Sequence, residues 1–180
     1  MSKFEEKQLE REEIFDGAVL HVVKDKILLP DGNTSYREFC LHKGAVAVIP
    51  ITDENEVILV RQFRYAHHRE FLEIPAGKFD FIGEDPLEAA KRELSEETGA
   101  TAKKFVYLGV LDTTPALIDE KIHMFLAEGL TFGESHPDED EFLSVEKTPL
   151  KELVEMVMNG EIRDAKTQIA ILKAARIRGL

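Results

Sequence analysis

A group of acidic side chains near the middle of the chain has the spacing of a metal-binding site. At about 100° per residue on a helix, Glu93, Glu96 and Glu97 lie beside the apolar stripe that contains Ala90 and Leu94. Glu93 and Glu97 are like charges four residues apart, which destabilises an isolated helix by about 0.2–0.5 kcal/mol. A divalent cation would turn this repulsion into a binding site, because Mg²⁺ prefers carboxylate oxygens. A solvated acidic face is the commoner interpretation, so the flanking sequence must decide between the two.

The flanking sequence favours the metal site. From Gly77 the chain reads GKFDFIGEDPLEAAKRELSEETGA, which closely resembles the Nudix box: a glycine, a glutamate at fixed spacing, then R-E-U-x-E-E-x-G-U with U aliphatic. The positions from the glutamate onward are occupied in order by Glu84, Arg92, Glu93, Leu94, Glu96, Glu97, Gly99 and Ala100. Two features differ from the box: six residues rather than five separate Gly77 from Glu84, and Ala100 is small. The additional residue lies in the loop before the helix, so the helical spacing is unchanged.

The resemblance implies a role for each acidic residue of the box. Glu93 and Glu97 are the main metal ligands, and Glu96 and Glu84 assist them. The resemblance also implies that the backbone carbonyl of Ala76 is a further ligand, that Glu96 takes part in catalysis, and that Arg92 orients the glutamates through charge-assisted hydrogen bonds. The implied cofactor is Mg²⁺, with Mn²⁺ as the other candidate.

A second acidic run lies further along the chain, at residues 138–141. Such a run is usually a solvated loop, but the ADP-ribose pyrophosphatase branch of the family has a D-E-x-E motif at this distance after the box. By that resemblance Glu139 is the general base or positions the attacking water. Glu141 is then an accessory residue on the substrate side, which binds metal or anchors the loop.

Substrate-binding candidates precede the box. Gln62-Phe63-Arg64 matches a family run whose arginine contacts phosphate, which makes Arg64 the candidate diphosphate ligand. Tyr36 and Phe39 could stack on an adenine, although packing within a β-hairpin explains them equally well. In the loop 112–121, Ile118 replaces a serine found in relatives and Glu120 is retained, so this loop does not fix the preferred sugar.

Local sequence patterns predict the strands and helices that position these residues. Strands are predicted at residues 18–30, 35–42, 45–51, 57–65, 71–75, 105–112 and 122–127. Helices are predicted at 86–98, 149–158 and 164–176, the first with Asp85 as N-cap and Gly99 at its end. This mixed α and β order lacks the alternation of a parallel doubly wound sheet. With the resemblance, it predicts a Nudix α/β/α sandwich with a mixed sheet over residues 43–180, after an N-terminal β-hairpin region over residues 1–42.

Composition limits the classes of partner. The 180 residues carry 23 basic and 35 acidic side chains, a net charge of −12, which argues against a nucleic acid polymer as ligand. The longest apolar run, residues 45–51, is far shorter than the roughly 20 residues of a membrane-spanning helix. The N-terminus lacks the apolar core of a signal peptide, and Cys40 is the single cysteine. We therefore expect a soluble, cytoplasmic protein that does not associate with membranes.

The resemblance implies a hydrolase that cleaves ADP-ribose to AMP and ribose 5-phosphate and forms a homodimer through its N-terminal hairpin. Two alternatives stay open at this point. One is a pyrophosphatase for another nucleoside diphosphate sugar, such as GDP-mannose. The other is a non-catalytic module that binds ADP-ribose, although the complete set of box glutamates favours an enzyme.

Overall fold

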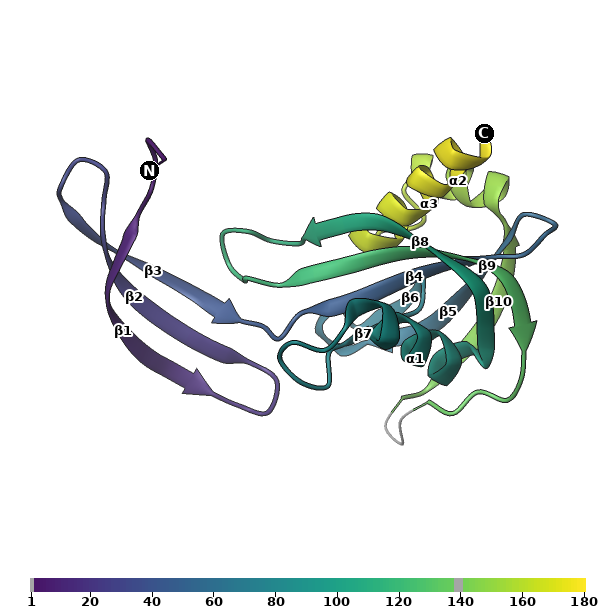
Figure 1. Ribbon diagram of the computed structural model, residues 1–180, viewed down its shortest axis with the longest axis horizontal. Helices are drawn as coiled ribbons and strands as arrows, with labels where there is room; N and C mark the ends of the chain where they lie inside the picture. Colours follow the sequence, from purple (N-terminus) through teal and green to yellow (C-terminus); the bar gives the residue numbers. More distant parts are fainter. Residues whose placement is uncertain (1, 138–140) are drawn as a thin grey trace. The chain divides into compact units, whose positions relative to one another are not determined.

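The computed structural model describes residues 2–137 and 141–180 (Figure 1). The chain divides into two compact units. The first unit contains residues 1–43 and 112–121, and the second contains residues 44–111 and 122–180.

The first unit contains a three-stranded antiparallel sheet in the order β1-β2-β3. Its strands are β1 (Lys7–Asp16), β2 (His21–Leu28) and β3 (Thr34–Leu41). The predicted hairpin corresponds to β2 and β3, whereas β1 was not predicted. Arg11 on β1 lies opposite Asp25 on β2 and donates two hydrogen bonds of 2.7 Å to its buried carboxylate. A one-residue slip would separate this bidentate pair, so the pair helps to fix the register of β1 on β2.

The second unit contains the other elements of the chain. They are β4 (Ala45–Ile51), β5 (Glu56–Arg64), the 3₁₀ turn η1 (Tyr65–His67), β6 (Arg69–Glu73), β7 (Ala76–Lys78), α1 (Pro86–Thr98), β8 (Ala100–Asp112), β9 (Lys121–Phe132), β10 (Leu143–Pro149), α2 (Leu150–Met158) and α3 (Ala165–Arg178).

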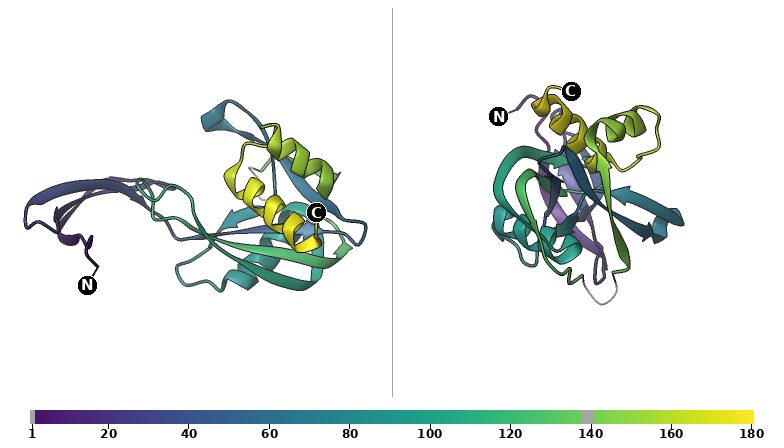
Figure 2. Two further views of the ribbon diagram at one scale, coloured as in Figure 1. Left: turned by 90° about the horizontal axis from the view of Figure 1, so that it is seen from above. Right: turned by 90° about the vertical axis from the view of Figure 1, so that its right-hand side faces the viewer.

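These strands form one mixed sheet in the order β10-β5-β4-β9-β8, with β6 paired to β5 and β7 paired to β4. The pairing of β4 with β9 is parallel, and the pairings of β4 with β7 and of β5 with β6 and β10 are antiparallel. Helix α1 covers one face of the sheet, and α2 and α3 cover the other (Figures 1 and 2). The predicted α/β/α sandwich is therefore confirmed.

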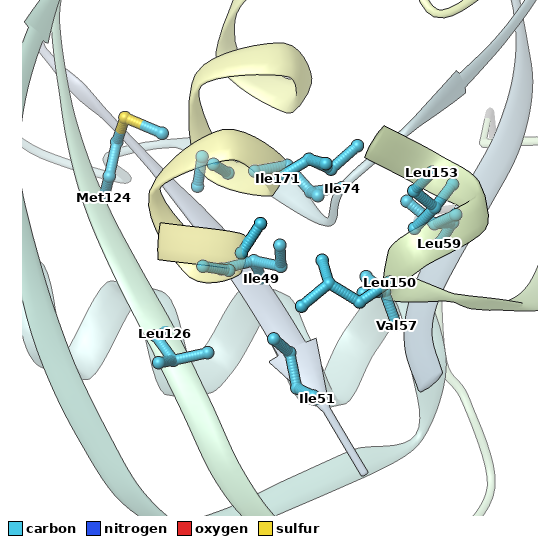
Figure 3. Packing of buried hydrophobic residues seen from close by; sticks show 14 of the residues in the cluster. Ile49, Ile51, Val57, Leu59, Ile74, Met124, Leu126, Leu150, Leu153 and Ile171 are labelled. Atoms are coloured by element: carbon cyan, nitrogen blue, oxygen red, sulfur yellow. The ribbon is translucent and has the colours of Figure 1, made fainter. Parts of the chain in front are cut away.

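Strand β4 is buried along its whole length and supplies both halves of the core. Alternate residues face opposite sides of a strand. Ile49 and Ile51 pack with Leu150 of α2 and Ile171 of α3, as Figure 3 shows. The side chains of Val46 and Val48 pack with Ala90 and Leu94 of α1. The sheet is thus anchored to the helices on both faces, and α1 is held rigidly against it.

Helix α1 begins and ends at the predicted residues because its end signals are local. The Asp85 carboxylate accepts hydrogen bonds from the amides of Leu87 and Glu88, at 2.8 and 3.1 Å, and Pro86 occupies the first turn. Gly99 ends the helix with a left-handed φ of 67°. Along residues 2–137 and 141–180, no helix is both long and apolar enough to cross a membrane.

Candidate functional site

The buried side of α1 presents two carboxylates to the short strand β7. Glu93 is 9% exposed and Glu97 only 2%. The amide of Ala76 donates a hydrogen bond of 3.3 Å to Oε2 of Glu97. Gly77, the next residue, lies directly against the Glu93 carboxylate, since a Cβ built on Gly77 would stand 2.0 Å from it. The helix and the start of β7 thus enclose two acidic groups.

Arg92 lies at the edge of this carboxylate group and contacts three of the box glutamates. Its Nη1 donates to Oε1 of Glu93 at 2.8 Å and to Oε2 of Glu96 at 3.0 Å. Its Nη2 donates to the carbonyl of Lys78 at 3.3 Å and lies 3.6 Å from Oε1 of Glu84. A single guanidinium therefore connects three box glutamates and the backbone at the end of β7, and this arrangement is suited to an orienting role.

The electrostatics of the two buried carboxylates indicate a deficit of positive charge. Burial raises the pKa of Glu93 to about 7, although the charge of Arg92 opposes the rise. Burial, together with the negative charges of Glu93 and Glu141, raises the pKa of Glu97 to about 8. Ionising both groups at once is unfavourable unless another cation joins them.

The donor set at α1 fits a hard divalent cation. Its side-chain donors are the carboxylate oxygens of Glu84, Glu93, Glu96 and Glu97, and oxygen is the donor that Mg²⁺ and Mn²⁺ prefer. In the conformation of the structure, residues 2–137 and 141–180 bring no three His, Cys, Asp or Glu side chains close enough to ligate one ion. Glu93 and Glu96 are turned toward Arg92 instead. Metal binding would therefore require these carboxylates to exchange the guanidinium for the ion.

The absence of a side chain at Gly77 gives a direct test of this site. We expect Gly77→Ala to weaken metal binding by roughly 10–100-fold, the usual range when the support of a ligand is lost. The added methyl group would displace the Glu93 carboxylate that lies 2.0 Å from its position. The measurement is activity as a function of Mg²⁺ concentration. Gly133→Ala is the control, because a Cβ built on Gly133 would lie at an ordinary contact distance of 3.6 Å from its nearest neighbour. If the activity of Gly77→Ala depends on Mg²⁺ concentration as that of the wild type does, the prediction is wrong.

The loop before α1 accommodates its additional residue at the surface. The amide of Asp80 donates to Oε2 of Glu84 at 2.7 Å, and the amide of Glu84 donates to the carbonyl of Phe81 at 3.2 Å. Phe81 and Ile82, at the tip, are 61% and 84% exposed. The base of the loop is thus closed around Glu84 while the tip extends into solvent.

Arg64, the candidate diphosphate ligand, belongs to a second charged cluster at the end of β5. Its Nε and Nη2 donate to the two oxygens of Glu73 at 2.8 and 2.7 Å. Lys166 donates to Oε2 of Glu73 at 2.5 Å and lies 3.1 Å from Asp164. Arg64, Glu73, Asp164 and Lys166 line a cavity of about 360 Å³. Glu73 and Lys166 lie 93 residues apart in the sequence, and neither was predicted as a site residue.

The buried Glu73 makes the stability of the fold sensitive to acid. Burial alone would raise the pKa of Glu73, but the hydrogen bonds and charges of Arg64 and Lys166 outweigh burial and lower it from 4.5 to about 2. Since the folded-state value is the lower one, the ionised carboxylate stabilises the fold fully above pH 4.5, and this contribution is lost as the pH falls toward 2. A shift of this size corresponds to about 3 kcal/mol.

We therefore expect the free energies of unfolding of the wild type and of Glu73→Gln to converge in acid. Protonation makes the wild-type carboxyl group nearly equivalent to the amide of the variant. Urea denaturation at several values between about pH 7 and pH 3 measures the difference. A difference that stays constant over this range would show that the pKa of Glu73 is the same in the folded and the unfolded protein.

The candidate base, Glu139, lies outside the described residues. The segment before it is attached to the end of α1: the amide of Gly133 donates to the carbonyl of Gly99 at 2.8 Å, and the amide of His136 donates to the carbonyl of Glu96 at 2.9 Å. On the other side of the run, the charge of Glu141 raises the pKa of both Glu93 and Glu97, after the larger effect of burial. The described flanks of the acidic run thus lie beside the carboxylate group of α1.

Tyr36 and Phe39, the candidates for stacking on an adenine, belong to the first unit. Tyr36 on β3 is 57% exposed, and the ammonium of Lys24 lies 5.0 Å from the centre of its ring. The ring of Phe39 lies 5.5 Å from the guanidinium of Arg11. Both aromatic side chains therefore have partners within their own sheet. The second unit brings together the remaining described candidates, which are Arg64, Ala76, Glu84, Arg92, Glu93, Glu96, Glu97 and Glu141.

Comparisons with known proteins show the family of the chain. The model of the NUDIX domain matches residues 41–168. An ADP-ribose pyrophosphatase of Bacillus subtilis (strain 168) is 44% identical over 173 residues, which cover 95% of this chain and 93% of that protein. A methanol dehydrogenase activator of Bacillus methanolicus is 43% identical over 170 residues, which cover 93% and 91%.

The fold is also found among solved structures. A crystal structure of an ADP compounds hydrolase superposes with a TM-score of 0.85 at 24% identity, covering 99% of this chain and 98% of the other. The family match extends from the end of β3 to the first turn of α3, and it therefore includes the sheet, the acidic face of α1 and the cluster around Glu73. Fold, box and family model agree, and the chain belongs to the Nudix family.

Proposed function

We propose that the protein is a Nudix hydrolase that cleaves ADP-ribose to AMP and ribose 5-phosphate, with Mg²⁺, or Mn²⁺ in its place, as the cofactor. The observation that carries the proposal is the buried pair Glu93 and Glu97 beside Gly77, two carboxylates of which Glu93 pairs with Arg92 and Glu97 accepts from the amide of Ala76. The name of the Bacillus subtilis relative supports ADP-ribose as the substrate.

The residues of α1 and β7 would hold the ion. Glu93 and Glu97 are the proposed main ligands, and Glu84, Glu96 and the carbonyl of Ala76 complete the set. A bound divalent ion supplies charge neutralisation to the diphosphate and lowers the pKa of a nearby water.

Arg64 is the proposed diphosphate ligand. Its Nε and Nη2 each donate one hydrogen bond to the carboxylate of Glu73. The third nitrogen of the guanidinium, Nη1, takes part in neither of these two bonds. A guanidinium can therefore keep its bidentate partner and still donate to a phosphate oxygen.

Hydrolysis needs one proton acceptor besides the metal ligands. The oxygen of a water forms a bond to one phosphorus while the bond from that phosphorus to the bridging oxygen breaks. The proton released by the water passes to the carboxylate of Glu139, the proposed general base. Glu141, whose charge reaches Glu93 and Glu97, belongs to the same acidic run and is the proposed accessory residue.

The substrate is tested with a panel of nucleotides. The purified protein is incubated with Mg²⁺ and with ADP-ribose, GDP-mannose or a nucleoside triphosphate, and released monophosphate is separated by chromatography. We expect AMP from ADP-ribose at the highest kcat/KM. Faster release of GMP from GDP-mannose would assign the other substrate, and binding of ADP-ribose without any product would support a non-catalytic module.

We also propose that residues 1–42 form a dimerisation region and residues 43–180 the catalytic domain. Several large apolar side chains of the first unit are exposed, namely Leu9, Ile14, Phe15, Val19 and Leu20. A small isolated sheet is marginally stable unless it packs on a partner.

A second copy of this chain is the proposed partner, so light scattering of the full-length protein should give twice the chain mass of 20.4 kDa. Deletion of residues 1–42 should give a monomer with an increased KM. A full-length protein that stays monomeric at high concentration would contradict the proposal.

A further inference from the structure

We infer that Glu73 is a positioning residue, which fixes the guanidinium of Arg64 in the orientation that binds the diphosphate. The inference rests on the proposed function, in which Arg64 is the diphosphate ligand. Three observations support it: Glu73 accepts two hydrogen bonds from Arg64, Glu73 is buried, and Lys166 of α3 donates to the same carboxylate.

The contact between Glu73 and Arg64 restricts the arginine strongly. Glu73 is 2% exposed at the end of β6, and the Arg64 side chain, on the adjacent strand, is 41% exposed. Two parallel hydrogen bonds of 2.8 and 2.7 Å define the plane of the guanidinium as well as its distance. The exposed part of Arg64 lines the cavity of about 360 Å³. The arginine is therefore held on one edge and presented to the cavity on the other.

Helix α3 fixes the carboxylate that holds the arginine. Lys166, in the first turn of α3, donates to Oε2 of Glu73 at 2.5 Å. Asp164 caps the helix by accepting from the amide of Thr167 at 2.9 Å, and it lies 3.1 Å from the Lys166 ammonium. The Thr167 hydroxyl accepts from the amide of Ile74, the residue after Glu73, at 3.0 Å. Both the side chain of Glu73 and the backbone next to it are thus tied to one rigid element.

The cluster adjoins the proposed metal ligands. The charge of Glu97 is among the influences that raise the pKa of Arg64, after those of Glu73 and Asp164. The charge of Lys166 in turn opposes the rise in the pKa of Glu97, in which burial is the largest effect. Arg64 and Lys166 therefore lie within electrostatic range of Glu97, one of the residues that would hold the ion.

A buried acid in an anion-binding cavity needs an explanation, because its negative charge opposes the binding of phosphate. If the cluster served only to attract the anion, Arg64 and Lys166 would do so better without Glu73. The contribution of the ionised Glu73 to the stability of the fold does not require that its partner Arg64 line a cavity. Orientation accounts for the arrangement, because an arginine that is already ordered loses less conformational entropy when the substrate binds.

The two explanations predict opposite effects for Glu73→Gln. Removing the negative charge should tighten anion binding if charge alone matters. We expect the reverse: kcat/KM for ADP-ribose should fall roughly 10–100-fold, as is usual when a supporting partner is lost, and the Kd of inorganic pyrophosphate should rise. Glu73→Asp keeps the charge but is too short to retain both hydrogen bonds, so it should be impaired as well.

The dependence on Arg64 is tested by a double-mutant cycle on the full-length protein. Wild type, Glu73→Gln, Arg64→Lys and the double variant are assayed for kcat and KM with ADP-ribose and Mg²⁺ and are titrated with pyrophosphate by calorimetry. Since Glu73 acts through Arg64, the double variant should be no worse than Arg64→Lys. Glu146→Gln is the matched control, because Glu146 forms a similar bidentate pair with Arg61 on the same strand, outside the cavity. It should retain wild-type kinetics.

Several results would overturn the inference. One is a wild-type kcat/KM in Glu73→Gln or Glu73→Asp. Another is tighter binding of pyrophosphate by Glu73→Gln. The third is a double variant whose loss of activity is the sum of the losses of the two single variants. Thermal unfolding shows which variants are folded, and Glu73→Asp replaces Glu73→Gln in the cycle if the glutamine variant does not fold. If the wild type lacks activity on ADP-ribose, the proposed function fails, and the pyrophosphate titration still decides whether Glu73 positions Arg64.

Discussion

Replacement of Glu97 by glutamine is expected to remove most of the hydrolytic activity while the protein stays folded. The amide has nearly the shape of the carboxylate but lacks the negative charge that a divalent cation needs. Metal ions contribute several kcal/mol of transition-state stabilisation, so kcat should fall by at least about 10²-fold. In the metal-free protein, the variant should unfold at a temperature no lower than the wild type, since it no longer places two acidic side chains together in a buried site.

The measurements are kcat at saturating Mg²⁺ and calorimetric titration with Mg²⁺ alone. Glu88→Gln is the matched control. Glu88 lies on the same helix, but its side chain is 66% exposed and pairs with Lys91 at 2.7 Å. This control should keep wild-type activity. Near-normal turnover of Glu97→Gln at saturating Mg²⁺ would remove Glu97 from the metal site.

Replacement of Glu139 by glutamine is expected to lower kcat by roughly 10²–10⁴-fold, the usual contribution of a general base, with little change in KM or Mg²⁺ affinity. A base must be free to accept the proton of water, and the box glutamates are engaged by the ion or by Arg92. The acidic run at residues 138–141 is the densest other supply of carboxylates. Its preceding segment is hydrogen-bonded to the end of α1 at Gly99 and Glu96.

Two further variants make this test specific. Glu134→Gln changes an exposed glutamate before the same run and should leave kcat unaltered. Glu141→Gln should have a milder effect than Glu139→Gln. Full kcat in Glu139→Gln together with loss of kcat in Glu96→Gln would place the base in the box.

The elements that the sequence predicted well are those with local signals. Helix α1 was predicted at its observed ends because Asp85, Pro86 and Gly99 act within one turn of the helix. Strand β1 was missed because all ten of its residues are exposed and KQLEREEIFD lacks the alternation of a half-buried strand. Strand β10 was missed for a similar reason, since it is a largely polar strand at the edge of the sheet and follows an acidic run.

The same distinction applies to the site. The glutamates of α1 were recognised because their spacing on one helix is visible in the sequence. The role inferred for Glu73 depends on Arg64, nine residues away, and on Lys166, 93 residues away, and only the folded sheet brings these groups together. In the sequence alone, Lys166 lies near the start of the predicted helix 164–176 and has no evident partner.

The short connection between β6 and β7 lets amide hydrogen exchange report on the site. Its two residues and the first residue of β7 bond to three different elements: the amide of Ile74 to Thr167 of α3 at 3.0 Å, the carbonyl of Pro75 to the amide of Val48 at 2.8 Å, and the amide of Ala76 to Glu97 at 3.3 Å. Only the last of these bonds uses a proposed metal ligand. The exchange rate at Ala76 should therefore change when Glu97 turns to an ion, while Ile74, two residues away, serves as the internal reference for opening of the fold.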